Sequence, residues 1–456
     1  MTHTVRANAA VAWPPGKRRC LGGALIALLL LLLAGAASIP FLFESSSILY
    51  KFGTDKLMLR AGKVLGMIAA TLVLFQLMLS ARIKFLDRIF ALDRLLNAHR
   101  TIGTTLACCL ILHPVLIFLP DDMLFMPFEW RYWPEFVGLF LLLSILGMAV
   151  SGNFRAVMGI RFDLWWMMHR MAAAAVAIAL FVHILFVSET FEQGFPRTVV
   201  FVAIALYAVL YLWVKLKRLV IRCRPYTISL VKPAGREAFQ LRITPNSRDI
   251  RPYAPGQFAL IRIHSPHISS EEHPFTIAAS PARSSDLEFV IRTSGDWTRH
   301  IGRVQPGDLV SIDGPYGLFT HLRCPENREI IMIAGGIGIT PMLSMLRYMS
   351  DIRDQRKITL VWSNRTREHI VLPEEFKAFE NSLPGLDITH ILTEDPVSGE
   401  TKRKLAQDQL ERLLSGCSRQ AMIFLCGPPQ MMTEIKKALV QLGFSRWRIF
   451  TERFGF

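Results

Sequence analysis

Four histidines in the first half of the chain form two pairs with the same spacing. His99 and His113 lie fourteen residues apart in one apolar stretch, and His169 and His183 repeat that spacing in another. An α-helix turns about 100° per residue, so both members of a pair lie on one helix face, about 21 Å apart along the axis. Two such helices side by side would place one His–His pair near each surface of a bilayer about 30 Å thick.

Facing neutral imidazoles are the ligands that a bis-histidine haem needs. We therefore predict two b-type haems, an inner one between His99 and His169 and an outer one between His113 and His183. The alternative is four unrelated histidines satisfied within a helix bundle. The repeated spacing favours the haem interpretation, because ionisable side chains inside a bilayer are costly and usually functional.

Helices must position these histidines, and the sequence has six uncharged apolar runs of 17 to 23 residues. That is the length needed to span the hydrocarbon layer, and hydrophobic residues make up 52% of the 456-residue chain. No comparable run follows Val214. The predicted spans are Leu21–Phe43, Val64–Ala81, Thr101–Pro120, Phe136–Phe154, Met171–Ser188 and Thr198–Val214.

The loops between the spans carry an asymmetric charge. One set of flanks holds 17 Lys and Arg residues against 6 in the opposite set, which places both chain ends in the cytoplasm by the positive-inside rule. We expect a multi-pass protein of the plasma membrane, the inner membrane of a bacterium. A cleaved signal peptide ending near Ser38 is an alternative for the first run, and it would leave this orientation unchanged.

Two arginines follow the inner histidines directly. Arg100 and Arg170 could pair with haem propionates, or they could be ordinary positive flanks of a span. The net charge of +16 borders the spans and no nucleic-acid motif is present, so nucleic acid is not an expected partner. The seven cysteines form no C-x-x-C pattern, which argues against c-type haem, iron–sulfur clusters and structural zinc.

The remaining half of the chain changes pattern once. Short alternating runs separated by Pro, Gly and Ser extend from Tyr226 to about Arg323, which is typical of an antiparallel barrel. From Glu329 onward strands alternate with helices, which indicates βαβ units around a parallel sheet. The expected domains are a tail (1–20), a six-helix membrane domain (21–222), a β-barrel (223–325) and an α/β domain (326–456).

Two glycine-containing turns in the α/β domain end predicted strands. The turn at 334–341 has glycines that let a backbone approach a phosphate, and a helix begins after it. A second turn at 426–429 follows another strand, although either could be a plain tight turn. Ser363, Arg365 and Arg367 follow the second strand, where no Asp or Glu is present to bind a ribose 2′-hydroxyl. They could hold the 2′-phosphate of NADPH, or form a solvated basic loop; NADH stays possible.

Together these residues resemble the NADPH oxidase and ferric reductase superfamily over nearly the whole chain. The resemblance is to a minimal prokaryotic type, in which a ferric reductase-like membrane domain is fused to a ferredoxin-NADP reductase-like dehydrogenase. It rests on the paired histidines, on the segments at 255–258, 273–276 and 291–298, on the two glycine turns, and on the C-terminal segment at 452–456.

The resemblance implies specific residue roles. The residues expected to contact FAD are His273, Pro274, Phe275, Thr276, Arg292, Gly295, Asp296, Trp297 and Thr298. Those expected to contact the nicotinamide nucleotide are Gly335, Gly336, Gly338, Thr340, Pro341, Ser363, Arg365, Arg367, Cys426, Gly427 and Pro428. The expected catalytic set is Thr276, Cys426 and Phe456, the last of which would cover the flavin ring until nicotinamide displaces it.

The function that this resemblance implies is electron transfer from cytoplasmic NAD(P)H through FAD and two b-type haems. The expected acceptor lies on the outer side and is O2, giving superoxide, or a ferric chelate; no obligatory protein partner is evident. One alternative is a b-type cytochrome dehydrogenase that delivers electrons to a quinone or a membrane partner. Another is a transporter or receptor with a nucleotide-sensing tail, which would lack flavin and haem absorbance.

Overall fold

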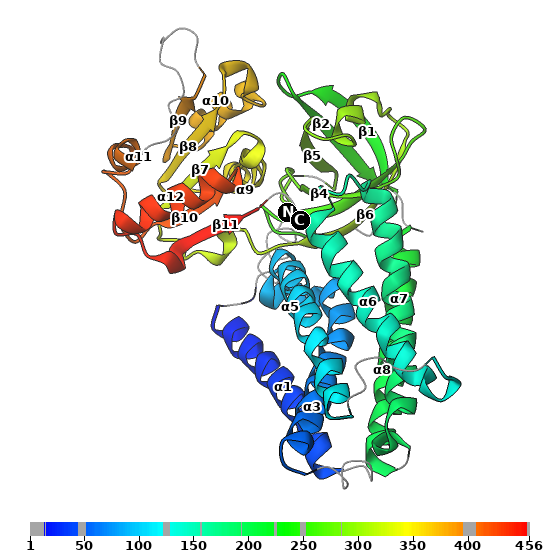
Figure 1. The fold of residues 1–456 in the computed structure, drawn as a ribbon. Coiled ribbons are helices and arrows are strands. Elements are labelled where there is room, and N and C mark those ends of the chain that lie inside the picture. Colours follow the sequence, from blue (N-terminus) through cyan, green and yellow to red (C-terminus); the bar gives the residue numbers. More distant parts are fainter. Residues whose placement is uncertain are drawn as a thin grey trace. The chain divides into compact units, whose positions relative to one another are not determined.

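The computed structural model describes residues 13, 15–43, 52–121, 128–155, 157–192, 194–222, 226–246, 252–283, 285–394 and 407–453. The chain forms two compact units, of which the first covers Arg19–Arg218 and the second begins at Leu219. The first is helical. The second contains two sheets (Figure 1).

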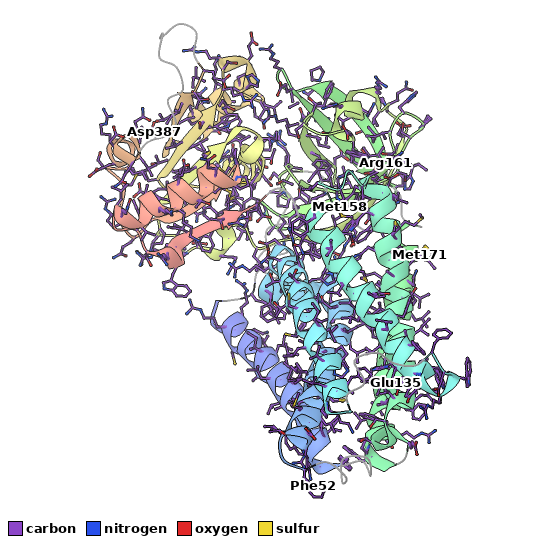
Figure 2. The ribbon with its side chains drawn as sticks, in the orientation of Figure 1. Phe52, Glu135, Met158, Arg161, Met171 and Asp387 are labelled. Atoms are coloured by element: carbon purple, nitrogen blue, oxygen red, sulfur yellow. The ribbon has the colours of Figure 1, made fainter. Side chains whose placement is uncertain are left out.

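Six helices in the described part of the first unit are long and apolar enough to cross a membrane, as the sequence predicts. Their apolar surfaces are largely exposed; Met171, for example, is 66% exposed and projects outward from its helix (Figure 2). A lipid-facing surface explains this exposure, because the bilayer takes the place of a protein core. The helices are α1 (Pro15–Leu42), α3 (Gly53–Ser80), α5 (Leu92–Phe118), α6 (Trp133–Phe154), α7 (Phe162–Val187) and α8 (Gly194–Arg222).

Four of these helices pack as two pairs, α3 with α5 and α6 with α7. A small core joins the pairs, and small residues such as Ala70 and Ala107 let the helices approach closely. Leu141 and Leu180 fill the opposite side of this core. The short helix α4 (Lys84–Phe90) precedes α5. Helix α5 begins at Leu92, so it includes His99 as well as the apolar run that was predicted to start at Thr101.

The second unit begins with an antiparallel six-stranded sheet whose strand order is β4-β3-β6-β1-β2-β5. Inward-facing Ile, Leu and Phe side chains form its core, with Phe289 and Ile261 fully buried. The strands are β1 (Tyr226–Pro233), β2 (Ala238–Pro245), β3 (Phe258–His264), β4 (Glu272–Thr276), β5 (Leu287–Arg292) and β6 (Leu309–Tyr316).

A parallel five-stranded sheet follows, with the order β11-β10-β7-β8-β9. Two separate apolar clusters cover its two faces, as expected for an α/β domain with helices on both sides. The strands are β7 (Ile330–Gly335), β8 (Ile358–Asn364), β9 (Leu386–Leu392), β10 (Met422–Cys426) and β11 (Ile449–Glu452). The helices are α9 (Thr340–Asp351), α10 (Pro373–Ser382), α11 (Gln407–Leu413) and α12 (Pro429–Gln441).

A buried arginine joins the two sheets. Arg347 on α9 is 10% exposed in its side chain and lies 2.8 Å from Glu288 on β5. Its guanidinium also donates two hydrogen bonds to Glu375, at 2.7 and 2.8 Å, and one to the Ala278 carbonyl at 3.0 Å. Burial alone would raise the pKa of Glu288, but Arg347 and the donors Arg242 and Gln240 hold that pKa below its ordinary value. The predicted fold class, a six-helix bundle followed by an antiparallel barrel and an α/β domain, is confirmed.

Candidate functional site

The inner histidine pair comes together in the helical unit. His99 on α5 and His169 on α7 have ring centroids 6.3 Å apart, with their planes at 66°. An imidazole nitrogen lies about 2 Å from a metal ion that it binds. Two axial rings on one ion therefore have centroids about 6 Å apart, once the ring radius is added. The observed spacing fits two axial ligands of one iron.

Three of the four histidines bond a backbone carbonyl through Nδ1. His99 Nδ1 donates to the Gln76 carbonyl at 3.2 Å, His113 Nδ1 to the Gly62 carbonyl at 2.8 Å, and His183 Nδ1 to the Pro134 carbonyl at 2.9 Å. A carbonyl only accepts hydrogen bonds, so Nδ1 carries the proton and Nε2 keeps its lone pair. Metal-binding histidines characteristically donate their other ring N–H in this way.

Two glycines make room for the outer pair. A Cβ added at Gly66 on α3 would lie 2.8 Å from Cε1 of His113, and one at Gly138 on α6 would lie 2.7 Å from Cε1 of His183. Each glycine follows by four residues the carbonyl that holds the same histidine, so the two lie one helical turn apart. His113 and His183 are therefore held in the same way by different helices.

His169 is held differently from the other three. Its Nδ1 has no hydrogen-bond partner among the residues that the structure describes. Instead its ring lies against the indoles of Trp165, at 5.1 Å between centroids, and Trp166, at 6.4 Å. The stack with Trp166 is nearly parallel, at 6°. Aromatic packing orients this ring.

The two arginines expected near the inner haem lie at the surface. Arg100 Nε donates to the Asn153 side-chain carbonyl at 2.9 Å, which links α5 to the end of α6. Arg170 is exposed on α7. Their roles toward propionates stay predictions.

The flavin-binding segments predicted in the barrel meet around one indole. His273 and Phe275 are alternate residues of β4, and the Trp297 ring lies 4.4 Å from the first and 5.8 Å from the second. Trp297 is buried and its Nε1 donates to the Ser269 carbonyl at 2.7 Å. The Trp297 ring therefore packs against the side chains of His273 and Phe275 on β4. Burial lowers the pKa of His273, whereas Glu271, 3.3 Å away, opposes that shift.

The other predicted flavin residues lie on β4 and beside the end of β5. Thr276 is buried at the end of β4, next to Pro274 and Phe275. The Thr298 hydroxyl accepts hydrogen bonds from the backbone N–H groups of Ser294 and Gly295, at 3.0 and 2.9 Å, and so shapes the turn.

Arg292 ends β5 and pairs with Glu237 at 3.1 Å. Asp296 is fully exposed and pairs with Arg299 at 3.7 Å. These residues form a polar rim at the end of β5.

The two glycine turns of the α/β domain contact each other directly. A Cβ at Gly338 would lie 2.4 Å from the carbonyl oxygen of Cys426, and one at Gly335 would lie 2.5 Å from the sulfur of Met431. Gly336 adopts φ +53°, a left-handed conformation that glycine tolerates without strain. Neighbouring parallel strands β7 and β10 place both turns at one sheet edge, where open α/β sheets bind ligands.

Several predicted nucleotide residues surround these turns. Thr340 and Pro341 are buried in the first turn of α9, and the Thr340 hydroxyl donates to the Ile337 carbonyl at 3.1 Å. Gly427 packs against Gly335, since a Cβ added at Gly427 would lie 3.1 Å from the Gly335 Cα. Burial raises the pKa of the Cys426 thiol well above its ordinary value, so this thiol is neutral.

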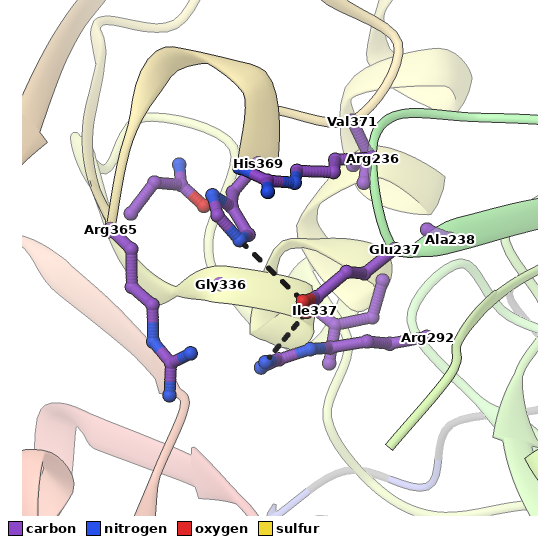
Figure 3. A pocket seen from close by; sticks show the side chains of 10 residues that line it. Arg236, Glu237, Ala238, Arg292, Gly336, Ile337, Arg365, His369 and Val371 are labelled. Atoms are coloured by element: carbon purple, nitrogen blue, oxygen red, sulfur yellow. Dashed lines mark hydrogen bonds and ion pairs between the residues drawn. The ribbon is translucent and has the colours of Figure 1, made fainter. Parts of the chain in front are cut away.

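A pocket opens between the barrel and this sheet edge (Figure 3). Of the three residues predicted for the 2′-phosphate, Arg365 lines it, whereas Ser363 and Arg367 are not among its lining residues. Sequence reasoning missed four polar lining residues, two from a separate barrel turn and two that lie close to the predicted residues. These are Arg236, Glu237, Asn364 and His369. Phe456 and Pro428 complete the predicted set; Pro428 precedes α12, and Phe456 lies outside the described residues.

Comparison with known families matches three segments in the order of the domains. Residues 65–180 match the ferric reductase like transmembrane component, residues 222–320 an FAD-binding domain, and residues 332–437 an oxidoreductase NAD-binding domain. The chain has the architecture of the NADPH oxidase and ferric reductase superfamily. The predicted resemblance is confirmed.

Individual relatives match the reductase half of the chain. NADH-cytochrome b5 reductase 1 of Lodderomyces elongisporus is 34% identical over 166 residues, which cover 35% of this chain and 55% of that protein. The reductase component of propane 2-monooxygenase from Mycolicibacterium goodii is 28% identical over 211 residues, covering 44% and 59%. The chain thus spans less than two thirds of the length of these relatives.

Among solved structures, flavohemoglobin from Malassezia yamatoensis matches with a TM-score of 0.47 at 18% identity, covering 88% of this chain and 99% of that one. The three matches give the chain a ferric reductase-like transmembrane domain followed by FAD-binding and NAD-binding domains, and the described residues include six helices long and apolar enough to cross a membrane.

Proposed function

We propose that this protein moves electrons from cytoplasmic NAD(P)H, through FAD and two b-type haems, to O2 or a ferric chelate on the outer side. The observation that carries the proposal is the set of four histidines. The inner pair has the spacing of two ligands of one iron, and both outer histidines have a carbonyl partner and a glycine beside the ring.

Each haem would be held by two histidine nitrogens, one from α5 and one from α7. His99 and His169 would bind the inner haem, and His113 and His183 the outer haem. The Nδ1 hydrogen bonds fix the rotation of three of these rings, and they also increase the basicity of Nε2. Each haem, when bound, would supply a one-electron carrier, and the two histidines would supply its protein ligands.

The reductase half would bind its two cofactors with the residues already described. FAD, when bound, supplies the chemistry that converts a two-electron hydride into single electrons. His273 and Phe275 present a flat wall for its ring, Thr276 offers a hydroxyl, and Arg292 offers a guanidinium fork for phosphate oxygens. Phe456 is proposed to cover that ring, and Cys426 to lie near the nicotinamide.

The glycine turns would take the nucleotide phosphates. Gly335, Gly336 and Gly338 carry no side chain over the sheet edge, and the N-terminus of α9 provides a partial positive charge there. The domain limits implied are 21–222 for the haem domain, 223–325 for the FAD domain and 326–456 for the nucleotide domain. Both chain ends would lie in the cytoplasm.

An acceptor assay on the purified full-length protein in lipid nanodiscs tests the proposal. NADPH should reduce the flavin and then the haem Soret band under anaerobic conditions. Oxygen should then give superoxide-dismutase-sensitive dye reduction, or ferric chelate should give ferrous iron anaerobically. Flavin reduction without haem reduction would refute transmembrane transfer, and reoxidation by a quinone but by neither other acceptor would favour the dehydrogenase alternative.

A further inference from the structure

The FAD barrel contributes a carboxylate to the nucleotide pocket. Glu237 lies in the turn between β1 and β2, and that turn is fixed to the α/β domain by the backbone N–H of Arg236, which donates to the Glu368 carbonyl at 3.1 Å. The Glu237 carbonyl accepts the backbone N–H of Thr293 at 2.8 Å, which ties it to the end of β5. The position of Glu237 is therefore set by both domains.

The Glu237 carboxylate lies between the guanidinium of Arg292 and the imidazole of His369 in the pocket. One oxygen is 3.1 Å from Arg292 Nη2 and the other is 3.9 Å from His369 Nε2 (Figure 3). His369 is oriented by its Nδ1 contact with the Thr366 hydroxyl at 2.8 Å. The Glu237 side chain is 39% exposed, so it is open to a ligand that enters the pocket.

The opposite wall is where an α/β domain binds the adenosine end of a dinucleotide. Gly336 and Ile337 come from the turn after β7, and Asn364 and Arg365 come from the end of β8. Asn364 is 4% exposed, and neither atom of its amide has a hydrogen-bond partner among the described residues. At the end of the second strand an acidic residue selects a free ribose 2′-hydroxyl, whereas an arginine accommodates a 2′-phosphate.

In this protein β8 ends at Asn364, a neutral amide, and the carboxylate of the same pocket belongs to Glu237 of the barrel. We propose that Glu237 is a specificity-determining residue: it accepts a hydrogen bond from the free 2′-hydroxyl of NADH and repels the 2′-phosphate of NADPH. Arg365 acts in the opposite sense on the same phosphate. This inference rests on the proposed function, because it assigns the nucleotide site of that reaction.

The balance of these two residues sets the nucleotide preference. Removing the carboxylate abolishes the repulsion and weakens the ribose contact, so both effects change the preference in one direction. Hydrogen bonds to charged groups correspond to about a ten- to hundredfold effect on binding. The ratio of kcat/KM for NADPH to that for NADH should rise by about that factor in Glu237→Gln.

The test uses the full-length, FAD-loaded protein and anaerobic stopped-flow reduction of the flavin by each nucleotide. Glu374→Gln is the matched control, since it removes one exposed carboxylate of α10 that pairs only with Lys377 among the interactions described. Its NADPH/NADH ratio should equal that of the wild type. Because Glu237 contacts Arg292, FAD content is measured for each variant and restored with added FAD before the assay.

A binding titration with adenosine 2′,5′-bisphosphate and with AMP measures the affinity of the same site for a ligand with and without a 2′-phosphate, and it requires no electron transfer. Glu237→Gln should tighten the bisphosphate relative to AMP, and Glu237→Asp, which keeps the charge but shortens the side chain, should give a smaller change. An unchanged ratio in Glu237→Gln, or an equal change for both ligands, overturns the assignment. If neither nucleotide reduces the wild-type flavin, the proposed function fails, while the titration still decides the role of Glu237.

Discussion

The glycine beside an outer histidine offers a direct test of the haem assignment. We expect Gly138→Ala to remove the outer haem, whereas Gly147→Ala on the same helix should leave it in place. A Cβ at position 138 would lie 2.7 Å from Cε1 of His183, but one at position 147 meets nothing within 4 Å. Both changes raise helix propensity equally, so the difference between them isolates the contact.

The size of the effect follows from the distances. Carbon atoms pack at about 3.5–4.0 Å, so the ring of His183 must retreat by roughly 0.8–1.3 Å. That shift exceeds the ~0.2 Å tolerance of a metal–ligand bond. It also disturbs the 2.9 Å hydrogen bond to the Pro134 carbonyl, and loss of such a partner typically costs about 10- to 100-fold in metal affinity.

The assay is pyridine haemochrome analysis per mole of purified protein, combined with a redox titration of the haem bands. Gly138→Ala should lose one spectral component and about half of the haem, with the FAD content unchanged. Full haem content and an unaltered titration in Gly138→Ala would refute the outer site. Equal loss in Gly147→Ala would show that the helix, rather than the contact, was responsible.

Three further predictions concern the other parts of the chain. The double variant His113→Ala with His183→Ala should keep the inner haem and its reduction by NADPH but lose reduction of the external acceptor, measured by the Soret band and acceptor turnover. Arg365→Ala should raise the KM for NADPH by about ten- to a hundredfold with little change for NADH, as steady-state kinetics with both nucleotides will show. Arg347→Met should destabilise the reductase unit by about 1.5–3 kcal/mol, since it removes the charge-assisted contacts to Glu288 and Glu375 while Arg242 still pairs with Glu288, and this should lower the temperature at which FAD is released. Because the pKa of Glu288 is lowered in the folded wild type, its contribution to stability is present above its unfolded pKa and is lost as the pH falls through the folded pKa. Arg347→Met should weaken that acid transition, of which Arg242 and Gln240 keep a part.

The sequence predicts the membrane helices well because each apolar run must be long enough to cross the bilayer. Helix ends are harder, since α5 begins at Leu92, nine residues before its uncharged run. The strand β4 contains Pro274, which interrupts the alternating pattern, so only the family resemblance indicated it. The four-residue strand β11 is too short to give a periodic signal.

Parts of the candidate site could be predicted where the signal lies within one segment. The glycine turns are such a case, and so is the fourteen-residue histidine spacing, which recurs within each of two helices. Glu237 and Asn364 line one pocket although 127 residues separate them in the chain, and no local pattern links a barrel turn to the end of β8. A glycine within a span, such as Gly66, is common in membrane helices, so its contact with His113 required the helix register.

The fourteen-residue spacing of the histidines has a counterpart on the helix that faces them. On α3 the carbonyls that hold His113 and His99 belong to Gly62 and Gln76, which are also fourteen residues apart. Antiparallel helices of equal rise keep both contacts in register, so a change in either spacing would break one of them.

The pair formed by α6 and α7 follows this arrangement only at its outer end. Pro134 holds His183, and a further fourteen residues along α6 leads to Met148, whose carbonyl instead accepts the Ser151 hydroxyl at 3.3 Å. His169 therefore depends on Trp165 and Trp166 for its orientation, and the inner haem would have one axial ligand fixed by a hydrogen bond and one fixed by aromatic packing. Since a carbonyl partner increases the basicity of a coordinating imidazole, this difference would make the two haem sites electronically unequal, although both have two histidine ligands.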